Sequence, residues 1–233
     1  MNDILIVPDV HGRRFWEPVL NYPGQIVFLG DYLDPYPSEG ITPDDAYSNF
    51  CRIVAFKMEN PERVTLLVGN HELHYYDHKY ECTRFSARHY VALHEILTSE
   101  KTRNLFQVCK QVDQFLFSHA GALKSWYDRH HDKFAPLGIT LEEQMNRYFR
   151  TAPDAFGEIS ALRRGQAASG SPLWADIHEH FDEPEPFVSD IIQIIGHTQM
   201  ENEEAYIEGN ICLVDNRKLY VINNEMIKCY ENP

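Results

Sequence analysis

Short apolar runs rich in β-branched residues recur along this chain and limit the folds that it can adopt. Each run is three to five residues long, and this length and composition predict buried β-strands rather than helices. Segments with helical spacing separate several of the runs, so we expect an α/β fold of stacked layers. The predicted strands are residues 4–7, 26–29, 64–68, 115–117, 191–195, 211–214 and 219–222.

Helix signals occur in three segments between these runs. A threonine cap followed by proline begins the first, and a capping box of threonine and glutamate begins the last. The predicted helical segments are residues 42–58, 85–112 (in one or two pieces) and 140–149. No repeat or linker divides the chain, so residues 1–233 are expected to form a single domain.

The charge balance bears on the partners that the protein can have. The chain has 21 Lys and Arg against 35 Asp and Glu, a formal net charge of −14. Duplex nucleic acid and anionic membranes require basic footprints, so neither is an expected partner. The sequence opens without the pattern of a signal peptide, and its five cysteines are too widely spaced for a zinc finger or a disulfide framework. We therefore expect a cytoplasmic protein with reduced cysteines.

A polar residue that can bind a metal follows each of five predicted strands, usually after a glycine that allows a sharp turn. The carboxyl ends of strands are where α/β sheets assemble their sites. Taken singly, each segment could be a polar turn, and a lone histidine is more often structural than a ligand. Their shared position favours a common site. The five segments are Pro8-Asp9-Val10-His11-Gly12, Gly30-Asp31-Tyr32-Leu33-Asp34, Gly69-Asn70-His71-Glu72, Ser118-His119-Ala120-Gly121 and Gly196-His197-Thr198.

In this order, the five segments resemble the motifs of the calcineurin-like metallophosphoesterases, and most closely those of the phosphoprotein phosphatase branch. Residues 171–176, Ser-Pro-Leu-Trp-Ala-Asp, also resemble the Leu-Trp-x-Asp stretch of that branch. The resemblance spans residues 9 to about 198. It implies a four-layer α/β/β/α sandwich in which helices flank two mixed sheets.

The resemblance also implies a pair of divalent cations. Hydrolysis of a phosphate ester at neutral pH needs a stronger nucleophile than water, and two cations about 3.5–4 Å apart can hold a bridging water whose pKa falls towards about 7. Oxygen and imidazole ligands suit manganese, our first expectation, and also iron, zinc, nickel or cobalt. The implied ligands are Asp9, His11 and Asp31 for the first cation, and Asp31, Asn70, His119 and His197 for the second; Asn70 would also contact phosphate.

His71 follows a predicted ligand directly, and Asp34 lies three residues after Asp31. The resemblance implies that His71 protonates the leaving alkoxide while Asp34 orients its imidazole, although Asp34 could instead cap a turn. The expected function is hydrolysis of phosphate monoesters, of a phosphoprotein or of a small molecule, by in-line attack of metal-bound hydroxide. Two alternatives stay open: a nucleotide or dinucleoside-polyphosphate hydrolase with the same ligands, and a non-catalytic binding module on this fold.

The sequence departs from the phosphoprotein phosphatase pattern at Pro35, where that branch carries an arginine. A planar guanidinium binds phosphate through two parallel hydrogen bonds, so another group is expected to replace it. Arg163 and Arg164 are the first candidates, and Arg13 and Arg14 are the second. Each of them could also be a solvated surface residue.

The remaining histidines are interpreted without a catalytic role. His74 and His78 have the i, i+4 spacing of one helical face and are expected at the rim of the site or in solvent. The pairs at 130 and 131 and at 178 and 180 are expected to be surface residues.

Overall fold

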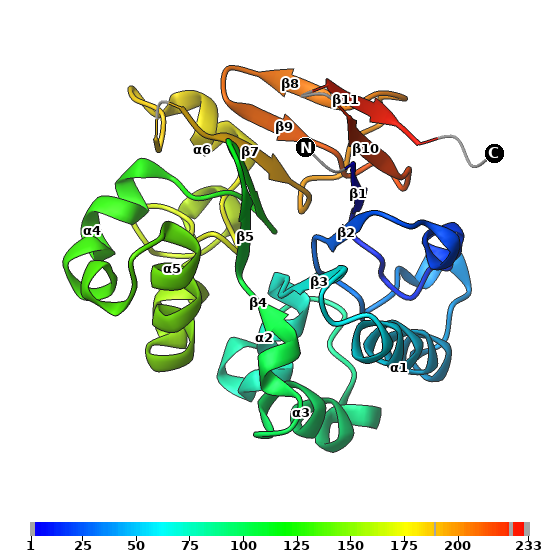
Figure 1. The fold of residues 1–233 in the computed structure, drawn as a ribbon. Helices are drawn as coiled ribbons and strands as arrows, with labels where there is room; N and C mark the ends of the chain where they lie inside the picture. Colours follow the sequence, from blue (N-terminus) through cyan, green and yellow to red (C-terminus); the bar gives the residue numbers. More distant parts are fainter. Residues whose placement is uncertain (1–2, 189, 224–225, 231–233) are drawn as a thin grey trace.

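The computed structural model describes residues 3–188, 190–223 and 226–230, and two mixed β-sheets lie between helices in it (Figure 1). In spatial order, the first sheet comprises β11 (Met226–Cys229), β10 (Tyr220–Asn223), β1 (Ile4–Val7), β2 (Gln25–Phe28), β3 (Val64–Leu67) and β4 (Phe106–Gln107). The second comprises β5 (Cys109–Val112), β6 (Phe115–Ser118), β7 (Ile192–Ile195), β9 (Ile211–Leu213) and β8 (Tyr206–Glu208).

The α-helices lie outside the two sheets. They are α1 (Pro43–Glu59), α2 (Asn70–Tyr76), α3 (Tyr90–Thr98), α4 (Lys124–Phe134), α5 (Leu141–Thr151) and α6 (Ile177–Asp182). In Figure 1, α4 and α5 lie to the left of the strands and α1 lies to the lower right. Capping boxes begin α1 at Thr42 and α5 at Thr140. The sequence predicts the box at Thr140, whereas at Thr42 it predicts only a threonine cap followed by proline. Among the described residues, no helix is long and apolar enough to cross a membrane.

Alternate residues of the central strands face opposite layers, and both layers are buried. In β1, Ile4 and Ile6 belong to a cluster that joins the two sheets and includes Phe117 of β6. Leu5 and Val7 belong instead to the core shared with the helices. Burial on both faces explains why these strands are continuous apolar runs. The predicted four-layer α/β/β/α sandwich is confirmed.

The strand directions bring the predicted motifs together. β1, β2 and β3 are parallel to one another, as are β6 and β7 in the other sheet. The turns after these strands contact each other. Within the second sheet, the N–H of Gly196 donates to the carbonyl of His119, and between the sheets the N–H of His197 donates to the carboxylate of Asp9. The polar residues after five strands therefore lie at one edge of the sandwich.

The helix predicted over residues 85–112 is wrong for most of that segment. Only Tyr90–Thr98 is α-helical, and the chain then forms β4 and β5, one strand in each sheet. The reason is the strand period: Phe106 and Val108 are buried, whereas Gln107 between them is partly exposed. These pairings are short and lie at the edges of the sheets, so their apolar period is easily taken for part of a helix.

Asn146 of α5 fixes the crossing between β4 and β5. Its side-chain oxygen accepts hydrogen bonds from the N–H groups of Val108, at 2.8 Å, and Cys109, at 3.3 Å, and its Nδ2 donates to the Cys109 carbonyl at 3.0 Å. This amide therefore satisfies backbone groups that are buried where the chain passes from one sheet to the other.

Replacement of this amide should destabilise the fold. We expect Asn146→Ala to lower the free energy of unfolding by about 1–3 kcal/mol, because it leaves buried backbone groups without partners. Arg150→Ala, at an exposed position of the same helix, is the matched control and should stay within about 0.5 kcal/mol. Urea unfolding followed by circular dichroism measures both, and equal small effects would contradict the role given to Asn146.

Candidate metal centre

The six predicted ligands meet where the two sheets end. His119 Nε2 lies 2.9 Å from Asn70 Oδ1, 3.1 Å from His197 Nδ1 and 3.5 Å from Asp31 Oδ1. His11 Nε2 lies 3.4 Å from the other oxygen of Asp31. The ligand atoms form two groups that could each hold a metal ion, and both groups contain Asp31. The groups are Asp9, His11 and Asp31, and Asp31, His119 and His197.

The imidazoles of the site direct lone pairs at acceptor oxygens. His11 Nδ1 lies 2.9 Å from the Leu33 carbonyl, and His119 Nδ1 lies 2.9 Å from the Leu29 carbonyl. Because a carbonyl only accepts, the proton of each neutral ring lies on Nδ1 and the lone pair of Nε2 faces Asp31. Burial lowers the pKa of His11 well below its ordinary value and that of His119 to about 3. Lone pairs of the imidazole nitrogens therefore face the carboxylate oxygens of Asp31, and a cation bound between them would satisfy both.

The carboxyl groups of the site are buried close to one another, which disfavours their ionised forms. Burial raises the pKa of Asp9 well above its ordinary value, and it raises the pKa of Asp31 to about 8. Asp215 lies beside Asp9, and burial raises its pKa to about 6. His197 presents Nδ1 to this group, 3.1 Å from His119 Nε2. A pair of dications would offset the cost of burying these carboxylates, and carboxylate oxygens with imidazole nitrogens form a donor set that fits divalent metals.

Two glycines allow the carboxylates to approach the backbone. A Cβ atom on Gly69 would lie 2.2 Å from Asp31 Oδ1, and one on Gly196 would lie 2.2 Å from Asp9 Oδ1. His11, Asp31 and His197 themselves have left-handed φ angles of 45°, 49° and 65°. Such backbone costs free energy and persists where its surroundings hold it in place.

Glu72 supplies part of that support, and no role was predicted for it. It is fully buried, and its carboxylate accepts hydrogen bonds from the N–H groups of Asp31, Tyr32 and Gly69 at 2.8, 2.8 and 2.9 Å. Burial raises the pKa of Glu72 to about 8. The side chain therefore ties the turn after β2 to the turn after β3.

The sequence model of one family, described as calcineurin-like phosphoesterase, matches residues 3–216. The chain belongs to this family. The resemblance inferred from the motifs is thereby confirmed, as is the prediction that the protein is a metallophosphoesterase enzyme. Calcineurin-like phosphoesterases are metal-dependent phosphoester hydrolases, and the two ligand groups are where metal would bind.

Solved structures of phosphatases share the fold of this calcineurin-like phosphoesterase. A cold-active protein-tyrosine phosphatase from a psychrophilic Shewanella species is 14% identical, with a TM-score of 0.61 over 99% of this chain and 81% of that one. A point mutant of a cold-active protein tyrosine phosphatase aligns with a TM-score of 0.64 at 14% identity, over 97% and 77%. A protein serine/threonine phosphatase from Saccharomyces cerevisiae is 13% identical, with a TM-score of 0.54 over 98% and 79%. A search of curated proteins gave no match.

Beside the ligand groups, Asp34 contacts three side chains of α2. His71 Nδ1 and His74 Nε2 lie 2.9 and 2.7 Å from Asp34 Oδ2, and the Tyr75 hydroxyl donates to Oδ1 at 2.7 Å. Burial alone would raise the pKa of Asp34, but the two imidazoles outweigh it and hold the pKa below its ordinary value. The buried carboxylate is therefore ionised near neutral pH.

The predicted exposure of His74 and His130 is wrong. His74 is fully buried, because α2 begins at Asn70 and this places His74 on the same face as His71. His130 is also buried, between the Tyr148 hydroxyl and Glu158. His78 is exposed, as predicted.

Arg84 is a further residue of the site that the sequence analysis did not identify. Its Nη2 lies 2.9 Å from His71 Nε2 and 3.5 Å from His11 Nε2, and its Nε donates to the Asp34 carbonyl at 2.9 Å. The guanidinium also lies over the Tyr36 ring, 3.8 Å from its centroid. No motif surrounds Arg84 in the sequence, and the proline at position 35 was the one signal that an arginine must come from elsewhere.

The arginines that the sequence analysis proposed as phosphate ligands have contacts that differ from those of Arg84. Arg163 donates to the Thr198 hydroxyl at 2.6 Å and contacts Asp176 at 2.7 Å, next to His197. Arg164 is exposed to solvent, as is Arg14. Arg13 forms two hydrogen bonds of 2.8 Å with Glu39. A phosphate-binding role for Arg163 and Arg164 stays a prediction.

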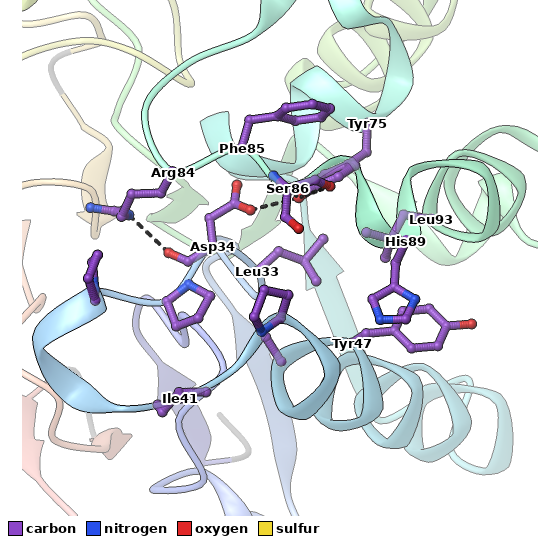
Figure 2. A pocket seen from close by; sticks show the side chains of 14 residues that line it. Leu33, Asp34, Ile41, Tyr47, Tyr75, Arg84, Phe85, Ser86, His89 and Leu93 are labelled. Atoms are coloured by element: carbon purple, nitrogen blue, oxygen red, sulfur yellow. Dashed lines mark hydrogen bonds between the residues drawn. The ribbon is translucent and has the colours of Figure 1, made fainter.

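A pocket of about 360 Å³ adjoins this site on the far side of Asp34 and Arg84. Figure 2 shows Arg84 and Asp34 at one end, and the ring pair of Tyr47 and His89 at the other. Those two rings are stacked, with centroids 4.2 Å apart. The walls between the ends are mainly apolar, so the pocket can receive an organic group next to the polar centre.

Metal binding at this centre should release protons. Below its pKa of about 8 the metal-free Asp31 carboxyl is protonated, and a cation must displace that proton, so the affinity for Mn²⁺ should fall up to about tenfold per pH unit as the pH is lowered from about 8. Calorimetry in two buffers of different ionisation heat counts the protons. Asp31→Asn should weaken binding by at least about 100-fold, whereas Asp132→Asn, at an exposed position, should not. An affinity independent of pH would contradict the assignment.

Proposed function

We propose that this calcineurin-like phosphoesterase hydrolyses phosphate monoesters at a pair of divalent cations, manganese first, with His71 as the general acid. The hydrogen-bonded pair of His71 and Asp34 beside the two ligand groups is the observation that supports the proposal. The residues that would hold the cations are Asp9, His11 and Asp31 for one, and Asp31, Asn70, His119 and His197 for the other.

The cations, when bound, supply an activated water and positive charge for the phosphoryl oxygens. The side chains of the protein determine where the two cations would bind. Asp31 belongs to both ligand groups, and Glu72 fixes its backbone. Asn70 begins α2, so its side chain lies at the same edge as the phosphoryl group that the site would bind.

The contacts of His71 suit an acid that protonates a leaving alkoxide. Its Nδ1 donates to the ionised Asp34, so a second proton would be held on Nε2, the ring atom that lies beside Arg84. A buried carboxylate at 2.9 Å stabilises the resulting imidazolium. A positioned histidine of this kind contributes about 10²–10⁴ to the rate.

Arg84 would supply the phosphate clamp that the sequence lacks at position 35. In the structure it donates towards Nε2 of His71, which must therefore present a lone pair there. A phosphate dianion between the two would draw the guanidinium away and leave Nε2 free to carry a proton. Binding of substrate and protonation of the acid would then be coupled.

The adjoining pocket would receive the organic part of the ester. Because the pocket shares Asp34 and Arg84 with the polar centre, the leaving group would lie on the side where His71 donates its proton. A monoester places one organic group there. A phosphoprotein side chain and a small phosphoester both meet this requirement.

Removal of the acid should affect poor leaving groups most. We expect His71→Asn to lower kcat for an alkyl monoester by about 10²–10⁴ and to lower kcat for p-nitrophenyl phosphate far less, because a phenolate leaves without a proton. Steady-state rates of the manganese-loaded enzyme measure this, with His78→Asn as the exposed control.

The same assay tests the function as a whole. Equal losses with the two esters would remove His71 as the acid. Preference for a bis-ester would overturn the monoesterase assignment. Preference for a dinucleoside polyphosphate would establish the alternative hydrolase function. Absence of turnover with every ester would instead support a non-catalytic binding module.

Arg84→Ala should lower kcat/KM for a phosphate monoester by about 10–100-fold, because a charge-assisted hydrogen bond contributes about 1.5–3 kcal/mol. Arg88→Ala is the matched control: Arg88 lies in the same loop, is exposed and pairs with Asp44. Steady-state kinetics with p-nitrophenyl phosphate measures both. If Arg84→Ala has no effect and Arg163→Ala lowers kcat/KM instead, Arg163 is the clamp.

A further inference from the structure

A second cluster of metal-binding atoms lies on the other side of His71. Cys82 Sγ is 3.3 Å from His74 Nδ1 and 3.8 Å from His71 Nδ1. The three ligand atoms lie within 4.8 Å of one another. Of the three candidate metal groups among the described residues, this is the one with a sulfur ligand.

The spacing of these atoms suits a small tetrahedral ion. Zinc is held at about 2.3 Å from sulfur and about 2.0–2.1 Å from nitrogen, so its ligands lie about 3.3–3.6 Å from one another. The two sulfur-to-nitrogen separations, 3.3 and 3.8 Å, are close to that range. A thiolate with two imidazoles selects zinc over manganese, which prefers oxygen ligands.

The surroundings of His74 prepare it as a ligand. Its Nε2 lies 2.7 Å from the Asp34 carboxylate, and its Nδ1 lies 3.4 Å from the N–H of Cys82, which can only donate. The ring proton therefore belongs on Nε2, and Nδ1 presents a lone pair to the sulfur. The usual outer partner of a zinc-bound imidazole is a carboxylate beside its far nitrogen, and Asp34 lies in that place through its close ion-pair contact with His74 Nε2.

We infer that Cys82 Sγ, His74 Nδ1 and His71 Nδ1 form an inhibitory zinc site, separate from the ligand groups of the metal centre. Zinc there takes Nδ1 of His71 away from Asp34 and removes the imidazole from acid catalysis. That effect on turnover rests on the proposed function, whereas zinc binding does not. The fourth position of the ion is open to water.

The binding step balances in protons. Zinc forms bonds to the sulfur and to the two nitrogens. The thiol loses its proton to the buffer, and the Nδ1 proton of His71 is replaced by one on Nε2, so the ring stays neutral. Burial raises the pKa of the Cys82 thiol, so without a cation the thiol stays protonated. The hydrogen bonds of the metal-free cluster must also be displaced, which fits reversible inhibition rather than a resident ion.

Metal binding at the proposed zinc site can be measured with cobalt, without an assay of enzyme activity. Added to the manganese-loaded protein, Co²⁺ should give a thiolate-to-cobalt charge-transfer band, and Zn²⁺ should abolish it by displacement. Cys82→Ser should lose the band, whereas Cys229→Ser, at an exposed free cysteine, should keep it. Thermal unfolding verifies that both variants fold. A missing band in the unmodified protein, or one that survives in Cys82→Ser, overturns the site.

Turnover gives the second readout. Cys82→Ser should keep the basal manganese-dependent rate and raise the zinc concentration for half-inhibition by at least about tenfold. Inhibition unchanged in Cys82→Ser would mean that zinc displaces manganese from the metal centre, and would overturn the inhibitory role. Should the enzyme prove inactive on every phosphoester, the cobalt band still decides the zinc site, so failure of this inference and failure of the proposed function are distinguishable.

Discussion

The carboxylate of Asp31 is the contact on which the rest of the site depends. One of its oxygens lies 3.4 Å from His11 Nε2 and the other 3.5 Å from His119 Nε2, so a single side chain joins ligands from both sheets. Its backbone carbonyl accepts hydrogen bonds from Val10 and His11, and its N–H donates to Glu72. A left-handed residue with a buried carboxyl is costly, and these contacts hold it in place. The turns after β1 and β2 are thus fixed relative to one another before any metal binds.

Charge explains why the centre needs cations although the protein as a whole is acidic. A net charge of −14 gives no long-range attraction for phosphate. Burial raises the pKa of Asp9 and Asp31 and lowers that of His119, so the metal-free centre tends towards neutral groups. Cations reverse this balance by restoring the carboxylates and adding positive charge. Positive charge at the centre must therefore come from bound cations and from neighbouring guanidinium groups, of which Arg84 lies 2.9 Å from His71 Nε2.

The sequence predicted the strands and their polar ends because both signals are local. A buried run, a glycine and a ligand residue occur within a few positions, as at Gly69 and Asn70. The partners from elsewhere in the chain were not predictable in this way. Glu72 acts through backbone groups of the turn after β2, His74 is buried by the register of α2, and Arg84 reaches the centre from a loop without a motif. The error at residues 106–112 has the same origin, because two short edge strands are defined by their pairing partners.

In the proposed function the phosphate clamp is Arg84 rather than an arginine at position 35, and this changes the part of the chain to which the clamp is attached. A guanidinium beside the second motif would be fixed by the turn after β2. Arg84 instead belongs to the loop after α2, where its Nε holds the Asp34 carbonyl and its ring contact is Tyr36. Cys82 lies two residues earlier in that loop, on the opposite side of the His71 ring. One loop thus places a guanidinium 2.9 Å from Nε2 of His71 and a thiol 3.8 Å from Nδ1, so both nitrogens of this imidazole face groups of the same loop.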